Sequence, residues 1–183
     1  MSGQLSHPAP TVPAPPGART SARRILLEVS AIVAVFALVG VACGFLWEIV
    51  WTPPGGAAVH GKWLLDDKGL PNDFAGTGLY FLIAALAGLV LGILVARLVT
   101  RDELVSLAAI LVGSVLAAYL MWLVGTSLGP ADPAILARTA KDLEPIPGDL
   151  RVQGKGAFLG FPFGSMLGAS TAYFLGTRRH RSP

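Results

Sequence analysis

The chain has 183 residues, of which 53% are hydrophobic and only 14% charged, and its formal net charge is +3. Soluble globular domains carry about 25% charged residues, so this composition, with a mean hydropathy of +0.63, excludes an ordinary soluble domain. It indicates an all-α integral membrane protein whose first partner is the lipid bilayer, and no nucleic-acid partner is expected.

The first 18 residues, MSGQLSHPAPTVPAPPGA, are rich in proline and carry no charged side chain. Such a segment cannot bury enough apolar surface to offset the entropy of ordering, so residues 1–18 are predicted to be a disordered tail. The PAPP stretch resembles part of a polyproline recognition segment, which is the alternative interpretation.

Four uncharged, mostly apolar runs follow the tail, and each is close to or above the length of about 18 residues that suggests a spanning helix. Together they predict a four-helix transmembrane domain over residues 19–177, followed by a basic cytoplasmic tail at 178–183. The predicted helices are at about 25–50, 74–98, 104–128 and 156–177, with outer loops at 51–73 and 129–155.

The first span begins after a pair of arginines and contains the only cysteine, Cys43, with a small residue before it. This arrangement is similar to a signal segment, but the apolar run continues past Cys43, which favours an uncleaved anchor. Lipidation of Cys43 is left open. Near the outer end, Glu48 lies between Trp47 and Trp51, where an aromatic belt marks a membrane interface. Glu48 is therefore either a structural interface residue or a candidate functional carboxylate.

The two outer loops are long enough to form a small extracytoplasmic cap. The Asp67-Lys68-Gly69 turn signal in the first loop predicts one or two short strands around it. In the second loop, Asp132 is placed to cap a short helix over about residues 133–143, whose first residue is Pro133. The predicted fold is thus four transmembrane helices with a cap of short strands and one short helix.

Small residues recur at every fourth position in the fourth span, GAFLGFPFGSMLGASTAYFLG. In lipid, helices associate by close backbone approach at such rows. The row either packs within the chain, most simply against the second span, or forms an oligomer contact or pore lining. Pro162 in this span predicts a kink. The glycines assigned to helix packing in the four spans are Gly40, Gly44, Gly88, Gly92, Gly113, Gly160, Gly164 and Gly168.

A weak internal repeat accompanies these rows. FAGTGLYFLIAALAGLVLG resembles VQGKGAFLGFPFGSMLG in its paired glycines, and each segment follows a loop that contains PND or PGD. Two related helical hairpins running in the same direction through the membrane are the corresponding interpretation.

Arginine placement predicts that both termini are cytoplasmic, because basic residues gather near helix ends on that side. The outer loops hold basic residues over a longer length. The basic residues on the predicted inner side are Arg19, Arg23, Arg24, Arg97, Arg101, Arg178, Arg179 and Arg181.

The residues give no sign of catalysis. The three histidines lie in separate segments without metal-binding spacing, and there is no phosphate-binding loop, dinucleotide fingerprint or nucleophile elbow. No charge lies near the middle of any span, which disfavours a proton-coupled pump. We therefore expect no catalytic residues, no cofactor, no metal and no enzymatic activity.

The order of features resembles a family of uncharacterised actinobacterial four-helix membrane proteins, catalogued as a domain of unknown function. The matching pieces are GFLWEIVWTPP, DFAGTGLYFLIAALAGLVLGIL, AYLMWLVGTSLGP and PGDLRVQGKGAFLGFPFGSMLG, within about residues 25–176. The resemblance implies an envelope protein and supplies no catalytic residues.

Two functions are compatible with these features. The first is a non-enzymatic accessory or structural component of the bacterial envelope, in contact with another envelope membrane protein or with itself. The second is a small oligomeric channel or transporter subunit packed through its glycine-rich helices. The sequence does not identify a substrate, a partner or an oligomeric state.

Overall fold

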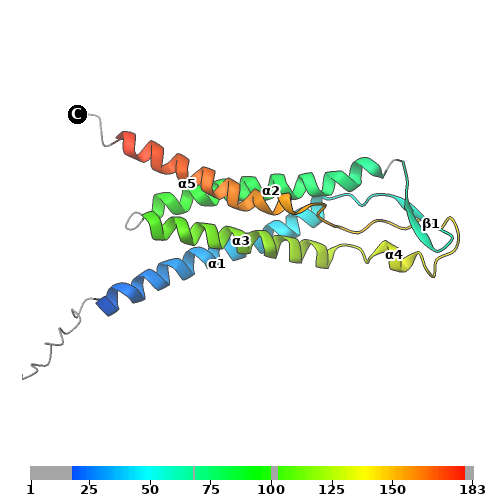
Figure 1. Cartoon of the computed structure of the whole chain (residues 1–183), viewed down its shortest axis with the longest axis horizontal. Helices are drawn as coiled ribbons and strands as arrows, with labels where there is room; N and C mark the ends of the chain where they lie inside the picture. Colours follow the sequence, from blue (N-terminus) through cyan, green and yellow to red (C-terminus); the bar gives the residue numbers. More distant parts are fainter. Residues whose placement is uncertain (1–17, 68, 100–102, 180–183) are drawn as a thin grey trace, which may run out of the picture.

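The computed structural model describes residues 18–67, 69–99 and 103–179 (Figure 1). The predicted tails at 1–18 and 178–183 fall largely outside these residues. The described elements are, in chain order, α1 (Ala18–Val50), β1 (Gly56–Val59), β2 (Lys62–Leu65), α2 (Leu70–Leu98), α3 (Glu103–Leu128), α4 (Pro133–Leu136), the 3₁₀ helix η1 (Lys155–Leu159) and α5 (Gly160–Arg179). The predicted fold class, four long apolar helices with a cap of two short strands and one short helix, is confirmed.

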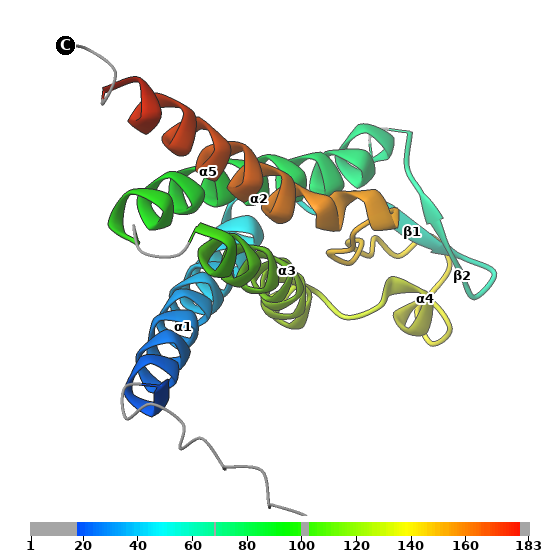
Figure 2. The same cartoon turned by 60° about the vertical axis from the view of Figure 1, so that its left-hand side comes forward.

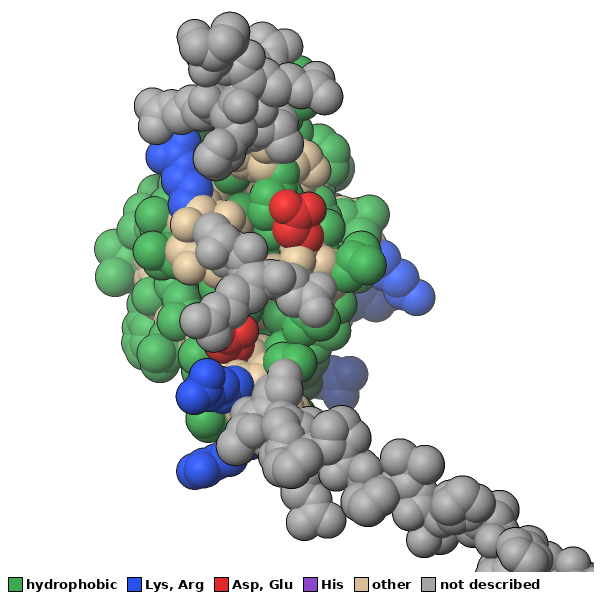
Figure 3. Space-filling view, turned by 90° about the vertical axis from the view of Figure 1, so that its left-hand side faces the viewer, with side chains coloured by type: hydrophobic (Ala, Val, Ile, Leu, Met, Phe, Trp, Pro, Cys, Tyr) green, Lys and Arg blue, Asp and Glu red, His purple; other side chains and the backbone are tan. Residues whose placement is uncertain are grey.

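The chain is an integral membrane protein with four helices that are long and apolar enough to span a bilayer. Large hydrophobic side chains cover the outside of the bundle; Leu38 is 71% exposed and Val112 is 61% exposed. A soluble protein rarely exposes so continuous an apolar surface. Figure 3 looks onto one end of the bundle and shows hydrophobic side chains around its perimeter.

The helices are arranged as two pairs, since α1 packs mainly on α3 and α2 packs mainly on α5 (Figures 1 and 2). The start of α1, the end of α2, the start of α3 and the end of α5 lie at the same end of the bundle, here called the terminal end. The strands and α4 lie beyond the opposite end, here called the cap end. The described ends of the chain, the start of α1 and the end of α5, therefore lie at the same end of the bundle.

The cap contains an antiparallel hairpin of β1 and β2, with Gly56 opposite Leu65 and Val59 opposite Lys62. The predicted turn is present, since the Gly69 N–H donates a hydrogen bond of 2.8 Å to the Asp66 carbonyl oxygen, but both strands precede it instead of lying around it. The hairpin turns at His60 and Gly61, whose φ angles are 50° and 74°, because a two-residue hairpin loop of the favoured kind needs positive φ at both central positions.

The short helix of the second loop begins as predicted but ends earlier. Asp132 caps α4, and its Oδ1 accepts a hydrogen bond of 2.8 Å from the Ala134 N–H. Only Pro133–Leu136 is helical, rather than residues 133–143. After α4 the backbone forms short hydrogen-bonded turns, and Leu143 adopts a φ of 66°. No continuous helix therefore places Ile135 and Leu143 on one face.

Pro162 does not interrupt a spanning helix. The segment entering the membrane is η1, and the α-helical hydrogen-bonding pattern of α5 begins at Gly160. Pro162 therefore lies in the first turn of α5, where the N–H groups have no partner within the helix. The proline costs no helical hydrogen bond there, which removes the physical reason given for a kink.

Candidate functional site

The predicted packing glycines of α2 and α5 lie against each other's backbone. A Cβ added at Gly88 would lie 2.5 Å from the Phe161 carbonyl oxygen, and a Cβ added at Gly160 would lie 3.0 Å from the Phe81 carbonyl oxygen. A Cβ added at Gly92 would lie closer still to the Ser165 carbonyl oxygen. Contacts this short leave no room for any side chain, so the two helices meet backbone to backbone.

The other two predicted packing glycines of α5 are equally close to the backbone of α2. Gly164 lies against the backbone of Ala85, and Gly168 lies against the backbone of Leu89. Gly156, in η1, differs, because nothing lies within 4 Å of a Cβ built there. The row therefore packs inside the chain on α2 from Gly160 to Gly168.

The glycines of α1 and α3 form the second close contact. A Cβ at Gly40 would lie 2.6 Å from the Ala117 carbonyl oxygen, and one at Gly44 would lie 2.8 Å from the Met121 carbonyl oxygen. A Cβ at Gly113 on α3 would lie 3.1 Å from atoms of the Phe36 side chain. Both helix pairs are thus built on the small-residue packing that membrane helices use.

The contacts in the two pairs are related by a nearly constant displacement along the chain. Gly88 and Gly164 are 76 residues apart, and each faces the backbone of the other helix at a corresponding place. Gly40 faces Ala117, which lies 77 residues further along the chain. These similar separations agree with the repeat predicted from the sequence, and the duplication of a helical hairpin stays a prediction.

An aromatic cluster fills the cap half of the bundle. The fully buried Trp47 donates a hydrogen bond of 2.9 Å from Nε1 to the Gly76 carbonyl oxygen, and its ring meets the Tyr80 ring edge-on at 5.0 Å. Tyr80 is also fully buried and donates a hydrogen bond of 2.6 Å to the Ala118 carbonyl oxygen. Phe158 contacts Tyr80 at 5.6 Å between ring centroids. These three side chains and two carbonyl groups connect α1, α2, α3 and η1, the segment that leads into α5.

The interpretation of Trp47 as an interfacial belt residue is wrong. Its side chain is fully buried, because Gly125 on α3 leaves space for the ring. Trp51 is half-buried and lies against Gly76, where a Cβ would come within 3.0 Å of the indole Nε1. Trp47 therefore packs the cap end of the bundle together, and Trp51 packs against the start of α2.

Polar side chains tie the second outer loop to the start of α2. Arg151 Nη2 lies 3.2 Å from Asp73 Oδ1, and the Gln153 side-chain amide also donates to Asp73. The Gln153 N–H donates to Thr77 Oγ1 at 2.9 Å. Arg151 is half-exposed, so the ion pair itself contributes little stability. Together with the Gln153 hydrogen bonds, the Arg151–Asp73 contact holds the segment that leads into η1 against the start of α2.

The cap has a small core of its own. Ala58, Ala137 and Ile146 are buried together, with Trp63 packed against them. Trp63 Nε1 donates a hydrogen bond of 3.0 Å to the Ile146 carbonyl oxygen. The hairpin, α4 and the segment after α4 therefore pack together as one small unit beyond the cap end of the bundle.

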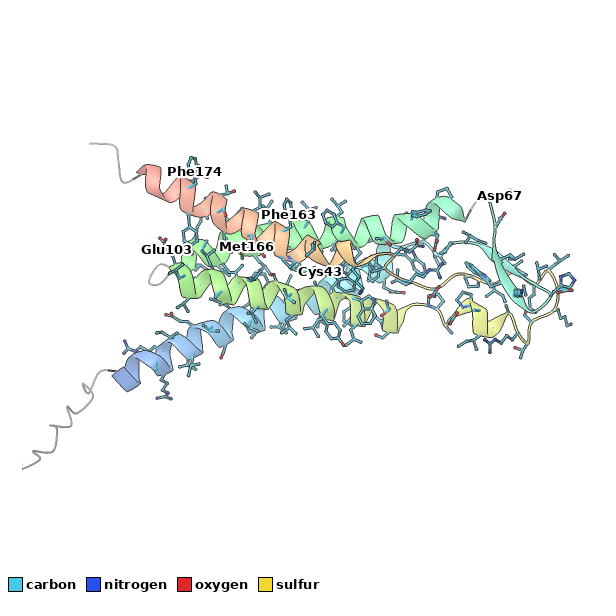
Figure 4. The ribbon with its side chains drawn as sticks, viewed as in Figure 1. Cys43, Asp67, Glu103, Phe163, Met166 and Phe174 are labelled. Carbon is cyan, nitrogen blue, oxygen red and sulfur yellow. The ribbon has the colours of Figure 1, made fainter. Side chains whose placement is uncertain are left out.

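The candidate carboxylate Glu48 is half-buried near the end of α1, and within the described residues it makes no hydrogen bond or ion pair. Cys43 is buried inside the bundle, whereas Glu103 lies at the terminal end (Figure 4). The structure does not bring Glu48 together with another ionisable side chain of the described chain.

A shallow groove of about 390 Å³ lies where α1 ends and α2 begins, lined by residues that include Val50, Trp51, Asn72 and Leu82. A second groove of about 360 Å³ in the cap is lined by Leu136, Glu144 and neighbouring residues. Among the described residues, no three His, Cys, Asp or Glu side chains are placed to hold a metal ion. Neither groove has a set of converging polar groups of the kind that fixes a small ligand.

Buried hydroxyl groups in the described bundle mostly bond to the backbone. Ser114 donates to the Leu111 carbonyl and Ser165 to the Pro162 carbonyl, each within its own helix. The Tyr173 hydroxyl, towards the terminal end of α5, is buried without a hydrogen-bond partner among the described residues. Such bonds to the preceding turn satisfy the buried hydroxyl groups and provide no nucleophile paired with a base.

No family model matches the chain, no curated protein matches it, and no solved structure matches it. The resemblance to an actinobacterial family therefore stays a prediction. Any function proposed for the chain therefore rests on its four spanning helices, its two glycine-packed helix pairs and its cap.

Proposed function

We propose that this protein is a non-enzymatic accessory or structural component of a bacterial cell membrane, which presents its cap to other components of the envelope. The observation that carries the proposal is the distribution of contacts. The glycine faces are used inside the chain, the cap half is filled by the aromatic cluster, and the cap is bonded to the bundle through Asp73 and Arg151.

The alternative, a channel or transporter subunit, has less support. It relied on a glycine ridge free to meet a second copy, and that ridge lies on α2 from Gly160 to Gly168. No charged residue lies near the middle of a span, and charges of that kind usually mark an ion or proton path.

A flux measurement separates the two functions. Proteoliposomes containing the purified chain are expected to release potassium, chloride or a small neutral dye no faster than protein-free liposomes of the same lipid. A pore-forming peptide added to the same liposomes serves as the positive control. Selective flux that increases with the amount of reconstituted protein contradicts the accessory function and favours the channel.

We place the terminal end in the cytoplasm. Arg23, Arg24 and Arg97 are described at that end, as the positive-inside rule requires. In a Cys43→Ala background, Ala131→Cys in the exposed second loop is expected to react with a membrane-impermeant maleimide in intact cells. Ser182→Cys is expected to react only after the membrane is permeabilised. The reverse pattern overturns this orientation.

A further inference from the structure

β2 is the outermost strand of the cap, because β1 is paired on both of its edges. The Ala58 N–H donates to the Glu144 carbonyl at 3.0 Å, and the Ala58 carbonyl accepts from the Leu143 N–H at 2.8 Å. The Gly56 carbonyl likewise accepts from the Ile146 N–H at 2.9 Å. The segment after α4 thus covers one edge of β1, and β2 covers the other.

The free backbone groups of β2 can be assigned from this pattern. Residues opposite each other in an antiparallel pair either exchange both hydrogen bonds or exchange none. Ala58 lies opposite Trp63 and Gly56 lies opposite Leu65, and both β1 residues use backbone groups on the far side. Trp63 and Leu65 therefore direct their N–H and C=O groups away from β1, where no described residue bonds to them.

The two faces of the hairpin differ. Trp63 and Ala58 pack towards Ala137 at the end of α4, and α4 lies between the hairpin and the spanning helices along the long axis of the molecule (Figure 1). Because side chains alternate along a strand, Lys62 and Leu64 lie on the opposite face, which points away from the spans. Leu64 is 53% exposed there.

We propose that β2 pairs antiparallel with β2 of a second copy of this chain, about a two-fold axis that passes beside Leu64. In this register Trp63 exchanges hydrogen bonds with Leu65 of the second copy, and Leu65 does so with its Trp63. The free donors and acceptors of both edges are then satisfied. Leu64 meets Leu64 of the second copy as a non-hydrogen-bonded pair, in which side chains are closest.

Charge selects this register. Asp66 continues the ladder, since its N–H donates to the Gly55 carbonyl at 3.0 Å, and its side chain is exposed on the face of Lys62. Pairing about Leu64 sets each Lys62 opposite Asp66 of the second copy. Pairing about Trp63 sets Lys62 opposite Leu64, and pairing about Leu65 sets Asp66 opposite Leu64, so neither brings Lys62 opposite Asp66. Opposite charges across a strand pair stabilise it, and like charges destabilise it.

The membrane sets one requirement on such a pair. The two-fold axis of an antiparallel strand pair is perpendicular to the sheet, so the proposal requires this axis to run along the bilayer normal. Two copies related in this way stand in the same bilayer with the same orientation, and they use the same surface patch, as a two-fold interface requires. The proposal does not depend on the accessory function.

Cysteine cross-linking in native membranes tests the pairing, with full-length protein in a Cys43→Ala background. Leu64→Cys is expected to give a covalent dimer on mild oxidation, because directly opposed residues are within disulfide reach, with about tenfold more dimer than Ile135→Cys. Ile135 is a matched control, since it is 62% exposed in the cap and lies on α4. Equal yields from the two variants, or a Leu64→Cys adduct with a different protein, overturn the proposal.

A second experiment tests the register. Lys62→Cys and Asp66→Cys are expected to cross-link with each other when two differently tagged variants are coexpressed, because the register sets them opposite. Neither is expected to cross-link when expressed alone, since like positions are then four residues apart along the strands, roughly 13 Å. Cross-linking of Lys62→Cys with itself but not with Asp66→Cys contradicts the register centred on Leu64.

Discussion

Replacing Gly164 with leucine is expected to prevent the α2–α5 pair from forming, and so to deplete the folded protein. A Cβ at this position would lie at or within 3.0 Å of three backbone atoms of Ala85. Backbone cannot move aside as a flexible side chain does, and overpacking of a well-packed contact typically costs 1–3 kcal/mol. Because leucine adds a whole side chain, we expect a loss of more than about 3 kcal/mol, measured as the free energy of unfolding in mixed detergent micelles.

Gly156→Leu is the matched control for this prediction. Gly156 belongs to the same four-spaced row, but the structure leaves open space beside it. A general intolerance of the span to leucine would damage both variants alike, whereas close packing on Ala85 damages only Gly164→Leu. Similar unfolding free energies for Gly164→Leu and the parent protein would show that the α5 row is not the contact described above.

The glycine rows made the bundle accessible to prediction, because spacing and chemistry point the same way. A row at every fourth residue marks one side of a helix, and small residues in lipid mark close helix contact. Gly164 and Gly88 belong to such rows and face the partner helix in the structure. Length and apolarity were sufficient for the four spans, since nothing else in a short chain explains 20-residue runs without charge.

The aromatic cluster and the turn were beyond the sequence, for reasons that particular residues show. Trp47 at the end of a span has the signature of an interfacial residue, and its burial depends on Gly125, which lies in a different helix. The hairpin turn at His60 and Gly61 places a non-glycine residue at positive φ, which the Asp67-Lys68-Gly69 turn signal obscured. The contact of Asp73 with Arg151 joins the start of α2 to a loop far away in the chain, and no local sequence pattern predicts it.

Replacing Trp47 with alanine is expected to be the most damaging aromatic truncation in the bundle. The side chain is fully buried, bonds to the Gly76 carbonyl at 2.9 Å and packs on Tyr80. Removal of a buried tryptophan costs about 3–5 kcal/mol, because the cavity is only partly closed by relaxation. The expected result is a fall of that size in unfolding free energy in detergent micelles.

Two further variants separate the causes of that loss. Trp47→Phe keeps an aromatic ring against Tyr80 but removes the Nε1 donor, so it is expected to cost about 1 kcal/mol for the hydrogen bond, plus a smaller cavity term. Phe45→Ala is the matched control on the same helix, because Phe45 is 47% exposed on the lipid-facing surface and a side chain there contacts lipid whether or not the helices associate. Little change for Phe45→Ala and a large loss for Trp47→Ala would assign the stability of the cap half to the aromatic cluster. Equal losses would instead mean that α1 is sensitive to truncation along its whole length, and that Trp47 has no special role in joining α1 to α2.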